Sequence, residues 1–462
     1  MTAGTAAQGK SGETKASPEA WWMLAVLFGL YTFSFIDRYV ITIMVPEIKQ
    51  SLGLSDFEMG IILGPAFAIV YSICGLPLGW VADRFPRRWV VFIGVAVFGL
   101  ATAASGLAGS FVGLFLARMF IGIGEASLSP AAYSLMADKF PRNLFGTASA
   151  VYNTAAKVGT ASALTLGGLA MGLAAGMELQ VPGLGAMEPW RMVFLMVGVP
   201  VMLLSLLVFT FSEPPRTAIP KLADGEKAHN ILSFLNAEKR VLAPMLLGFS
   251  LMAVCSFALA SWAPTYIARR FEWGPAQYGP ILGAVSLAAA LTLVFKGAIV
   301  DWLYTRGGKD AYVRFYTWLL MGTAPIAVVT FFIPDPLLFM ACYGVIQVVA
   351  LPTIVFLSAA VQLIVPGHLR GQMTAVFLFC LTVVGGSTGP VLVASLTDFV
   401  FRDDAMVGYS MAIVLCSAIP LALALLRYSL RPLREAVLKV EARQEAEIVW
   451  SSDAAPATSG RH

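Results

Sequence analysis

The chain consists of long apolar segments separated by short polar or Pro/Gly-rich breaks. Each segment has about the 20 apolar residues that an α-helix needs to cross a bilayer. The pattern predicts six spans, a polar stretch, and then six more spans. The predicted spans are 21–45, 60–82, 89–109, 111–136, 145–174, 190–212, 242–268, 277–303, 312–333, 336–364, 371–398 and 405–430. We therefore expect an all-α membrane protein with twelve transmembrane helices.

Two short patterns occur in both halves of the chain. Gly79 and Asp83 form G-x-x-x-D across the end of the second span, and Asp301 ends the same pattern 218 residues later. A stretch that begins with Pro and ends with Gly, 141–146, is repeated at 366–371, 225 residues later. Repeats at nearly equal offsets indicate a duplicated six-helix unit. We expect two pseudosymmetric six-helix bundles.

The resulting domain prediction has five parts. They are a disordered tail at 1–20, an N-terminal bundle at 21–212, a linker at 213–241, a C-terminal bundle at 242–430 and a tail at 431–462. The Lys and Arg residues predict the orientation of these parts, because cytoplasmic connections carry an excess of them. Of the 31, 22 lie in the termini and even-numbered connections, five on the opposite side and four within spans. We expect a multi-pass protein of the cell (inner) membrane with the linker and both termini cytoplasmic.

Composition excludes several other classes of protein. The chain is 58% hydrophobic and 13% charged, whereas soluble domains have about 25% charged residues. A net charge of +4 spread over 462 residues makes no concentrated cationic surface for nucleic acid. The five cysteines lie in apolar runs without a C-x-x-C pattern, and the three histidines lie outside the spans. We expect a monomer without metal or other cofactor, which is not an enzyme.

Charged residues inside the predicted spans are the main candidates for function. Insertion of each into a membrane costs about 2.5–3.5 kcal/mol, so such residues usually face the interior of the bundle. The clearest of them are Asp37, Arg38, Arg118, Glu125 and Lys157. Arg118 and Glu125 are seven residues apart, about 10.5 Å along one helical face. They cannot pair directly, so each is expected to meet a group of the first span or a ligand.

Two motifs give the chain a family resemblance. The segment from Gly79 through Asp83 and Arg84 to Arg87 and Arg88 resembles the signature loop of the major facilitator superfamily, with Pro86 where that loop has its second glycine. Arg118 through Gly122 resembles the R-x-x-x-G motif of the same superfamily. The resemblance implies the major facilitator fold and transport by alternating access.

A narrower resemblance joins the first and fourth spans. Asp37-Arg38-Tyr39 together with Gly122-Ile123-Gly124-Glu125-Ala126 resembles the Spinster family, and the chain looks like a bacterial Spinster homologue. Animal Spinster proteins move sphingosine-1-phosphate and lysophospholipids. The resemblance implies proton-driven transport of an amphipathic anionic or zwitterionic lipid-like substrate.

The charges can be given roles in such a transporter. Glu125 is the first choice for the group that binds the coupling proton, and Asp37 stays charged or shares that proton. Arg38 and Arg118 are the expected head-group contacts, because guanidinium groups bind phosphate with two hydrogen bonds. Lys157 and Asn153, one helical turn apart, are further candidates for the substrate site. The alternatives are that the buried charges hold spans in register, and that Lys157 reaches towards the membrane surface.

The signature loop predicts a conformational latch at the cytoplasmic surface. Its candidate residues are Gly79, Asp83, Arg84, Arg87, Arg88 and the pseudosymmetric Asp301. Asp83 could accept hydrogen bonds from the N-terminus of a neighbouring helix or from an arginine of the other half. The alternative for Arg84, Arg87 and Arg88 is that they only determine which side of the membrane the loop faces.

Other transport functions also remain open. The second half has few charges within its spans, which suits the acyl chain of a lipid. A small organic anion or a drug is the alternative substrate. A scramblase without proton coupling, or a sensor that resembles a transporter, is the alternative from another functional class.

Overall fold

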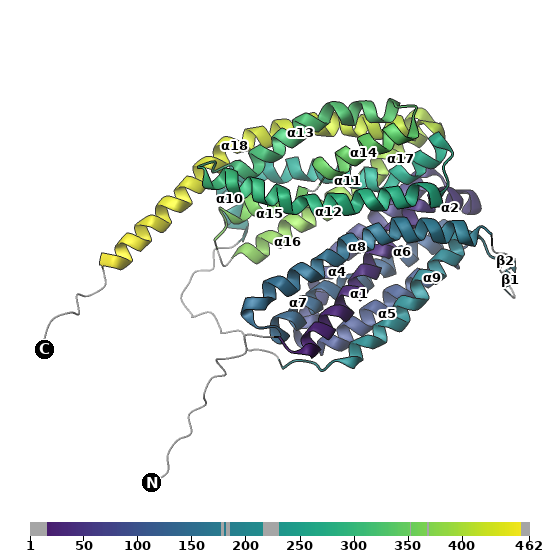
Figure 1. Cartoon of the computed structure of the whole chain (residues 1–462), viewed down its shortest axis with the longest axis horizontal. Helices are drawn as coiled ribbons and strands as arrows, with labels where there is room; N and C mark the ends of the chain where they lie inside the picture. Colours follow the sequence, from purple (N-terminus) through teal and green to yellow (C-terminus); the bar gives the residue numbers. More distant parts are fainter. Residues whose placement is uncertain are drawn as a thin grey trace, which may run out of the picture. The chain divides into compact units, whose positions relative to one another are not determined.

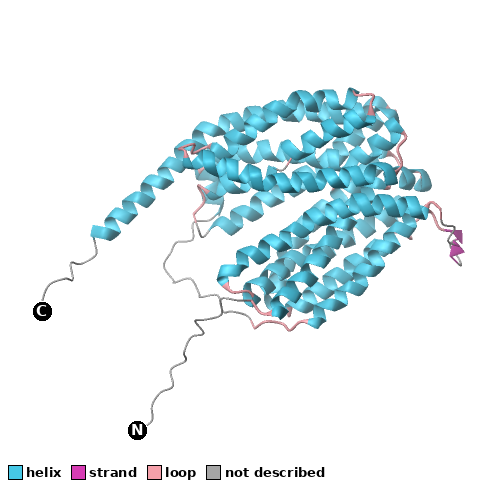
Figure 2. Ribbon diagram, viewed as in Figure 1, coloured by secondary structure: helices cyan, strands magenta, loops and turns pink. Residues whose placement is uncertain are grey.

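The computed structural model describes residues 16–176, 180–181, 185–215, 231–351, 353–366 and 369–453. The predicted tail up to residue 15, most of the linker (216–230) and residues 454–462 lie outside the described residues. The described chain is almost entirely helical (Figure 2). Its strands are two antiparallel pieces of two residues each, β1 (Gln180–Val181) and β2 (Gly185–Ala186).

The chain forms two compact units. Unit 1 comprises Met1–Ala223 and Trp273–Gly283, and unit 2 comprises Asp224–Glu272 and Ala284–His462. Helix α12 (Pro275–Thr305) therefore begins in unit 1 and continues in unit 2.

Unit 1 is a bundle of helices that run side by side (Figure 1). Its other helices are α1 (Pro18–Val40), α2 (Val45–Leu52), α3 (Asp56–Leu63), α4 (Pro65–Arg84), α5 (Arg87–Ser105), α6 (Phe111–Ala126), α7 (Leu128–Lys139), α8 (Arg142–Ala174) and α9 (Pro189–Leu204). Short 3-10 turns extend α1 to Ile43 and α9 to Thr210. The fourth predicted span consists of α6 and α7, which meet at Ser127.

Unit 2 has the remaining spans. Its helices are α10 (Ile231–Ala237), α11 (Lys239–Phe271), α13 (Ala311–Val329), α14 (Pro336–Val349), α15 (Thr353–Gln362), α16 (Arg370–Cys380), α17 (Thr388–Ser395) and α18 (Val407–Asp453). A 3-10 turn follows α13 (Thr330–Phe332), another (Asp404–Met406) precedes α18, and π-helical segments flank α17 (Leu381–Ser387 and Leu396–Phe401). Helix α18 continues as helix beyond residue 430, where the last span was predicted to end.

Local signals in the sequence start several of these helices. The Ser17 side chain caps α1 and precedes Pro18, which suits the first turn of a helix. Ser55 and Glu58 form a reciprocal capping box at the start of α3. Ser110 caps α6, the helix that carries Arg118 and Glu125. These caps satisfy backbone N–H groups that have no partner within the helix.

The structure confirms the predicted all-α membrane fold. Ten helical segments of the described residues are long and apolar enough to cross a membrane. Helix α8 is long enough at 33 residues, but its polar residues make it less apolar. The tenth predicted span, 336–364, consists of two shorter helices, α14 and α15. Large apolar side chains such as Leu76, Leu173 and Leu291 are 70–75% exposed, as expected where helices face lipid.

Close helix contacts hold unit 1 together. At Gly198 on α9, an added Cβ atom would lie 2.4 Å from the backbone nitrogen of Ala103 and 2.7 Å from the carbonyl oxygen of Gly99, both on α5. Backbone atoms cannot rotate away as side chains can, so only glycine fits here. By contrast, nothing lies within 4 Å of a Cβ atom added at Gly29 on α1.

We expect Gly198→Ala to destabilise the protein by about 1–3 kcal/mol, the usual cost of overpacking a core. Gly29→Ala is the matched control and should be neutral or stabilising, because alanine favours helix more than glycine by about 1 kcal/mol. Thermal unfolding of the purified protein in detergent measures both. Equal shifts in the melting temperature of the two variants would contradict the packing described here.

Candidate functional site

Four of the five predicted intramembrane charges meet inside unit 1. Asp37 on α1 is fully buried and contacts Arg118 on α6, with Oδ2 of Asp37 3.1 Å from Nη1 of Arg118. Thr102 on α5 donates a hydrogen bond of 2.7 Å to the other oxygen, Oδ1. Both oxygens of Asp37 therefore have a hydrogen-bond donor, and the carboxylate connects α1, α5 and α6.

The second pair joins the neighbouring residue of α1 to the same helix. Nε and Nη2 of Arg38 lie 2.7 and 2.6 Å from Oε2 of Glu125. The guanidinium group of Arg38 also lies over three aromatic rings, at 4.5 Å from the ring centre of Phe67, 4.6 Å from Tyr71 and 4.9 Å from Phe35. Such rings attract a cation through their negative faces. Arg38 is thus held by one carboxylate and three rings.

These contacts give a double ion pair between two helices, which we call the charge cluster (Asp37, Arg38, Arg118 and Glu125). Consecutive residues of α1 reach two residues of α6 that are two helical turns apart. The expectation that Arg118 and Glu125 each meet the first span agrees with these contacts. Asp37 pairs with Arg118 and not with its neighbour Arg38. Glu125 lies just before Ser127, where α6 ends and α7 begins.

The members of the charge cluster differ in their access to solvent. The side chain of Arg38 is 19% exposed, whereas those of Asp37, Arg118 and Glu125 are at most 2% exposed. Two buried atoms of the charge cluster lack a hydrogen-bond partner among the described residues, namely Nε of Arg118 and Oε1 of Glu125. Buried polar atoms without a partner are rare in proteins and need an explanation. The charge cluster thus has one accessible cation, one free N–H donor and one free carboxylate oxygen.

Helix α8 carries the other two predicted substrate residues, one turn apart. The side-chain amide of Asn153 donates to the hydroxyl of Tyr133 at 2.7 Å and to the carbonyl oxygen of Ser149 at 2.8 Å. Lys157 is exposed and has no hydrogen bond or ion pair with any described residue. The structure does not bring Lys157 into the charge cluster, and its role stays a prediction.

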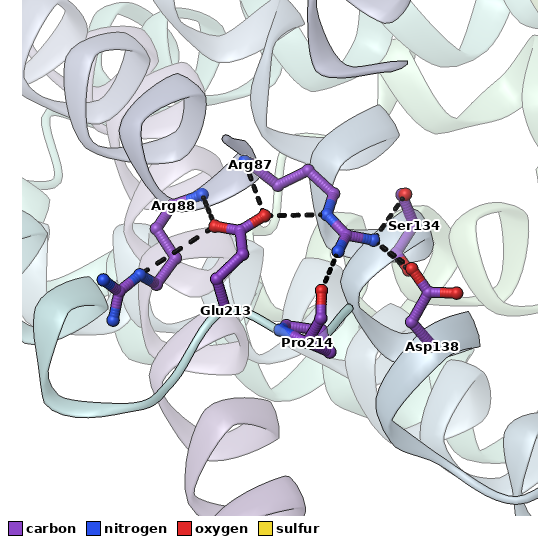
Figure 3. A network of polar contacts seen from close by, with 6 residues as sticks. All are labelled: Arg87, Arg88, Ser134, Asp138, Glu213 and Pro214. Carbon is purple, nitrogen blue, oxygen red and sulfur yellow. Dashed lines mark hydrogen bonds and ion pairs between the residues drawn. The ribbon is translucent and has the colours of Figure 1, made fainter. Parts of the chain in front are cut away.

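Arg87, a predicted latch residue, is instead a fully buried centre of polar contacts (Figure 3). It forms ion pairs with Asp138 at the end of α7 and with Glu213 after α9, the latter at 2.9 Å. Its guanidinium group also donates to Oγ of Ser134 at 3.1 Å and to the carbonyl oxygen of Pro214 at 2.6 Å. Arg87 therefore joins the start of α5 to two other parts of unit 1.

Arg88 belongs to the same network. Its backbone N–H donates to Oε2 of Glu213 at 3.0 Å, and its side chain donates to the carbonyl oxygen of Phe211. Burial alone would raise the pKa of Glu213, but hydrogen bonds from Arg88 and Arg87 hold that pKa below its ordinary value. The stabilisation from Glu213 is therefore complete above the ordinary carboxyl pKa and is lost only as the pH falls through the lowered value.

The other predicted latch residues lie at or near the surface of their own units. Asp83 is exposed and has no ion pair with any described residue, and the guanidinium group of Arg84 lies 3.9 Å from the ring centre of Trp80. Gly79 lies on α4, where an added Cβ atom would meet Pro130 at an ordinary 3.9 Å. In unit 2, Asp301 accepts a hydrogen bond of 2.6 Å from Tyr312. Their role as a latch stays a prediction.

Lys296 on α12 is a buried cation without a role in the sequence-based predictions. It is 8% exposed and donates to the carbonyl oxygen of Val348, in the last turn of α14. A cation is favourable there because the C-terminal carbonyl groups of a helix carry partial negative charge. The signal in the sequence was the place of Lys296 inside the predicted span 277–303.

We expect Arg87→Gln to lower the free energy of unfolding by about 3–5 kcal/mol, because it leaves two carboxylates without their buried partner. Arg84→Gln is the control, since Arg84 is exposed and stacks only on Trp80. Thermal unfolding in detergent near pH 7, where Glu213 is ionised, measures the difference. A melting temperature of Arg87→Gln equal to that of Arg84→Gln would show that the network contributes nothing to stability.

Comparison with known proteins agrees with this architecture. The family model of the Major Facilitator Superfamily matches residues 27–390. An MFS-type efflux pump of Mycolicibacterium smegmatis is 26% identical over 391 residues, which cover 83% of this chain and 86% of the pump. A probable L-galactonate transporter of Escherichia coli is 24% identical over 329 residues, which are 68% of each of the two chains.

Spinster proteins are similar in both sequence and structure. Human protein spinster homolog 1 is 30% identical over 290 residues, which are 59% of this chain and 50% of the human protein. A bacterial homologue of the human lysosomal transporter Spinster, solved in an inward-facing and unoccupied conformation, superposes with a TM-score of 0.75 at 22% identity. The superposed residues are 92% of this chain and 98% of the bacterial homologue. The chain is a multi-pass membrane transporter that belongs to the major facilitator superfamily and resembles its Spinster branch.

Proposed function

We propose that this transporter couples proton movement to the transport of an amphipathic anionic or zwitterionic lipid-like substrate, such as a lysophospholipid or sphingosine-1-phosphate. The observation that carries the proposal is the charge cluster, in which Arg38 is the one accessible cation and its partner Glu125 is buried. Transport would follow alternating access between the two sides of the membrane. The residues that bind the proton and the substrate are then in direct contact.

Coupling follows from competition for Arg38. In the structure its guanidinium group is occupied by Oε2 of Glu125. A phosphate group that binds the Nε and Nη2 edge of Arg38 replaces this carboxylate, and a carboxylate buried without its cation is unfavourable unless it takes up a proton. Protonation of Glu125 conversely frees Arg38 for an anion. Each event therefore favours the other, and the unpartnered Oε1 of Glu125 can accept the proton.

Arg118 supplies a second contact for the head group. Asp37 occupies Nη1 of Arg118, but Nε has no acceptor among the described residues. An oxygen of a phosphate group would satisfy this donor, as charge-assisted hydrogen bonds to phosphate are strong. Asn153 and Lys157 on α8 would add a polar and a cationic contact further along the first unit. Asp37 keeps its charge in this scheme, because Arg118 and Thr102 each donate a hydrogen bond to its carboxylate.

The proposed kind of substrate is supported by the side chains around Arg38 and by the resemblance to Spinster proteins. Three aromatic rings surround Arg38, and they offer apolar surface next to a cation. This combination suits a molecule with a charged head and an apolar tail. A small organic anion is the second candidate, which is supported by the similarity to a probable L-galactonate transporter.

We further propose that the protein resides in the cell (inner) membrane as a monomer with both termini cytoplasmic. No catalytic chemistry and no metal or other cofactor is needed for this function. Protons are the coupling ion.

We expect Glu125→Gln to abolish the pH dependence of transport while the protein remains folded, because glutamine mimics the protonated carboxyl. The measurement is uptake of lysophosphatidylethanolamine into proteoliposomes with and without a pH difference across the membrane. Glu272→Gln is the matched control, since Glu272 is an exposed carboxyl at the end of α11. L-galactonate in a parallel assay tests the alternative substrate.

Three outcomes would count against the proposal. Proton-driven uptake that is unchanged in Glu125→Gln removes Glu125 from coupling. Uptake of L-galactonate in place of the lysolipid favours the small-anion alternative. Lysolipid movement that never responds to a pH difference in the unmodified protein favours a scramblase.

A second prediction concerns Arg38. Arg38→Gln alone would leave Glu125 buried without a partner, so Arg38→Gln should be combined with Glu125→Gln. We expect the double variant to bind lysophosphatidylethanolamine about 10–100-fold more weakly than Glu125→Gln alone, from the loss of one charge-assisted contact of about 1.5–3 kcal/mol. Equilibrium binding to the purified protein measures this, and similar melting temperatures check the fold. Equal affinities would exclude Arg38 from the substrate site.

A further inference from the structure

A cavity of about 270 Å³ in unit 2 is lined by three arginines from three different helices. Arg306 lies at the end of α12, Arg314 in the first turn of α13, and Arg434 on the extension of α18 beyond its predicted span. Trp318 and Phe315 contribute apolar lining on the side of α13. The cavity belongs to unit 2, whereas the charge cluster belongs to unit 1.

The end of α12 fixes the position of Arg306. Gly307 has a φ angle of +91°, in the left-handed region that ends helices. The N–H groups of Gly307 and Gly308 donate to the carbonyl oxygens of Tyr304 and Leu303, which is the hydrogen-bond pattern of a Schellman motif. Arg306 is the last residue before this turn, and its guanidinium group lies 3.8 Å from the ring centre of Trp302.

The cavity has more positive than negative charge. Arg314 is neutralised by Asp310, whose carboxylate it binds with hydrogen bonds of 3.1 Å from Nε and 2.5 Å from Nη2. In contrast, Arg306 and Arg434 have no carboxylate partner among the described residues.

Nearby acids are engaged elsewhere. Asp301 accepts from Tyr312, Glu441 pairs with Lys309, and Glu435 pairs with Arg431. Two positive charges thus remain for an anion from outside the chain.

The residues beside the cavity indicate which kind of anion binds there. Trp302 and Trp318 are 50% and 51% exposed, and tryptophan is enriched where membrane helices meet the head-group region. Clusters of arginine at this level attract anionic lipids. A dissolved anion would not account for half-exposed tryptophans beside the cavity, whereas a phospholipid contacts both the tryptophans and the arginines.

We propose that this cavity binds the head group of an anionic phospholipid from the adjoining leaflet, which is the cytoplasmic leaflet in the predicted orientation. The phosphodiester lies between Arg306 and Arg434, and the acyl chains lie outside the bundle along the apolar surface next to Trp318. The bound molecule is a two-chain lipid of the bilayer and is distinct from the transported substrate. Binding would hold the extension of α18 against the ends of α12 and α13.

Native mass spectrometry of the full-length protein in detergent tests the proposal. Phosphatidylglycerol is titrated against phosphatidylcholine with the same acyl chains. We expect the unmodified protein to retain phosphatidylglycerol in preference. The double variant Arg306→Gln/Arg434→Gln should bind it about thirtyfold more weakly, since each arginine near an anionic lipid contributes about 1 kcal/mol.

The control is the double variant Arg427→Gln/Lys439→Gln. It removes the same charge from exposed positions of the same helix, α18, that do not line the cavity. We expect its affinity for phosphatidylglycerol to stay within about twofold of the unmodified protein. Equal weakening in both double variants would overturn the proposal in favour of general charge attraction. Displacement of the lipid by millimolar inorganic phosphate would overturn it in favour of a free-anion site.

Discussion

The free-energy cost of burying charged groups away from water determines how the helices of unit 1 pack. The four ionisable side chains of the charge cluster lie inside the bundle, and each would be unfavourable there without a partner of opposite charge. The contacts between α1 and α6 satisfy this constraint only in one register, because consecutive residues of α1 must meet residues two turns apart on α6. A shift of either helix by one turn would break both ion pairs at once. Thr102 adds α5 to this fixed arrangement.

Part of this site could be predicted from the sequence because helix geometry fixes it. The seven-residue spacing of Arg118 and Glu125 is enough to exclude a pair within one helix and to require partners elsewhere. It does not decide which carboxylate meets which guanidinium, since that depends on how α1 and α6 cross. The sequence therefore predicted the members of the charge cluster, but not the pairing of Asp37 with Arg118.

The fold as a whole was predicted more fully than its polar contacts. Span positions follow from apolar runs of sufficient length, which are local properties of the chain. The contacts of Arg87 are not local, because Asp138 and Glu213 are 51 and 126 residues away in the sequence. The signature motif drew attention to Arg87 for a surface role, whereas its burial became visible only in three dimensions. The division of the tenth span into α14 and α15 is not visible in its composition, because both pieces are apolar.

The network of Arg87 has a consequence for biosynthesis. Asp138 follows Arg87 closely during translation, but Glu213 and Pro214 are made only after the sixth span has been completed. At a synthesis rate of about 5–20 residues per second, the 126 residues between Arg87 and Glu213 take roughly 6–25 s. During this interval the arginine is already near the membrane with an incomplete set of acceptors. The nascent first unit can therefore reach its final packing only when the segment after α9 leaves the ribosome, which makes the whole six-span unit the smallest part that can fold to completion.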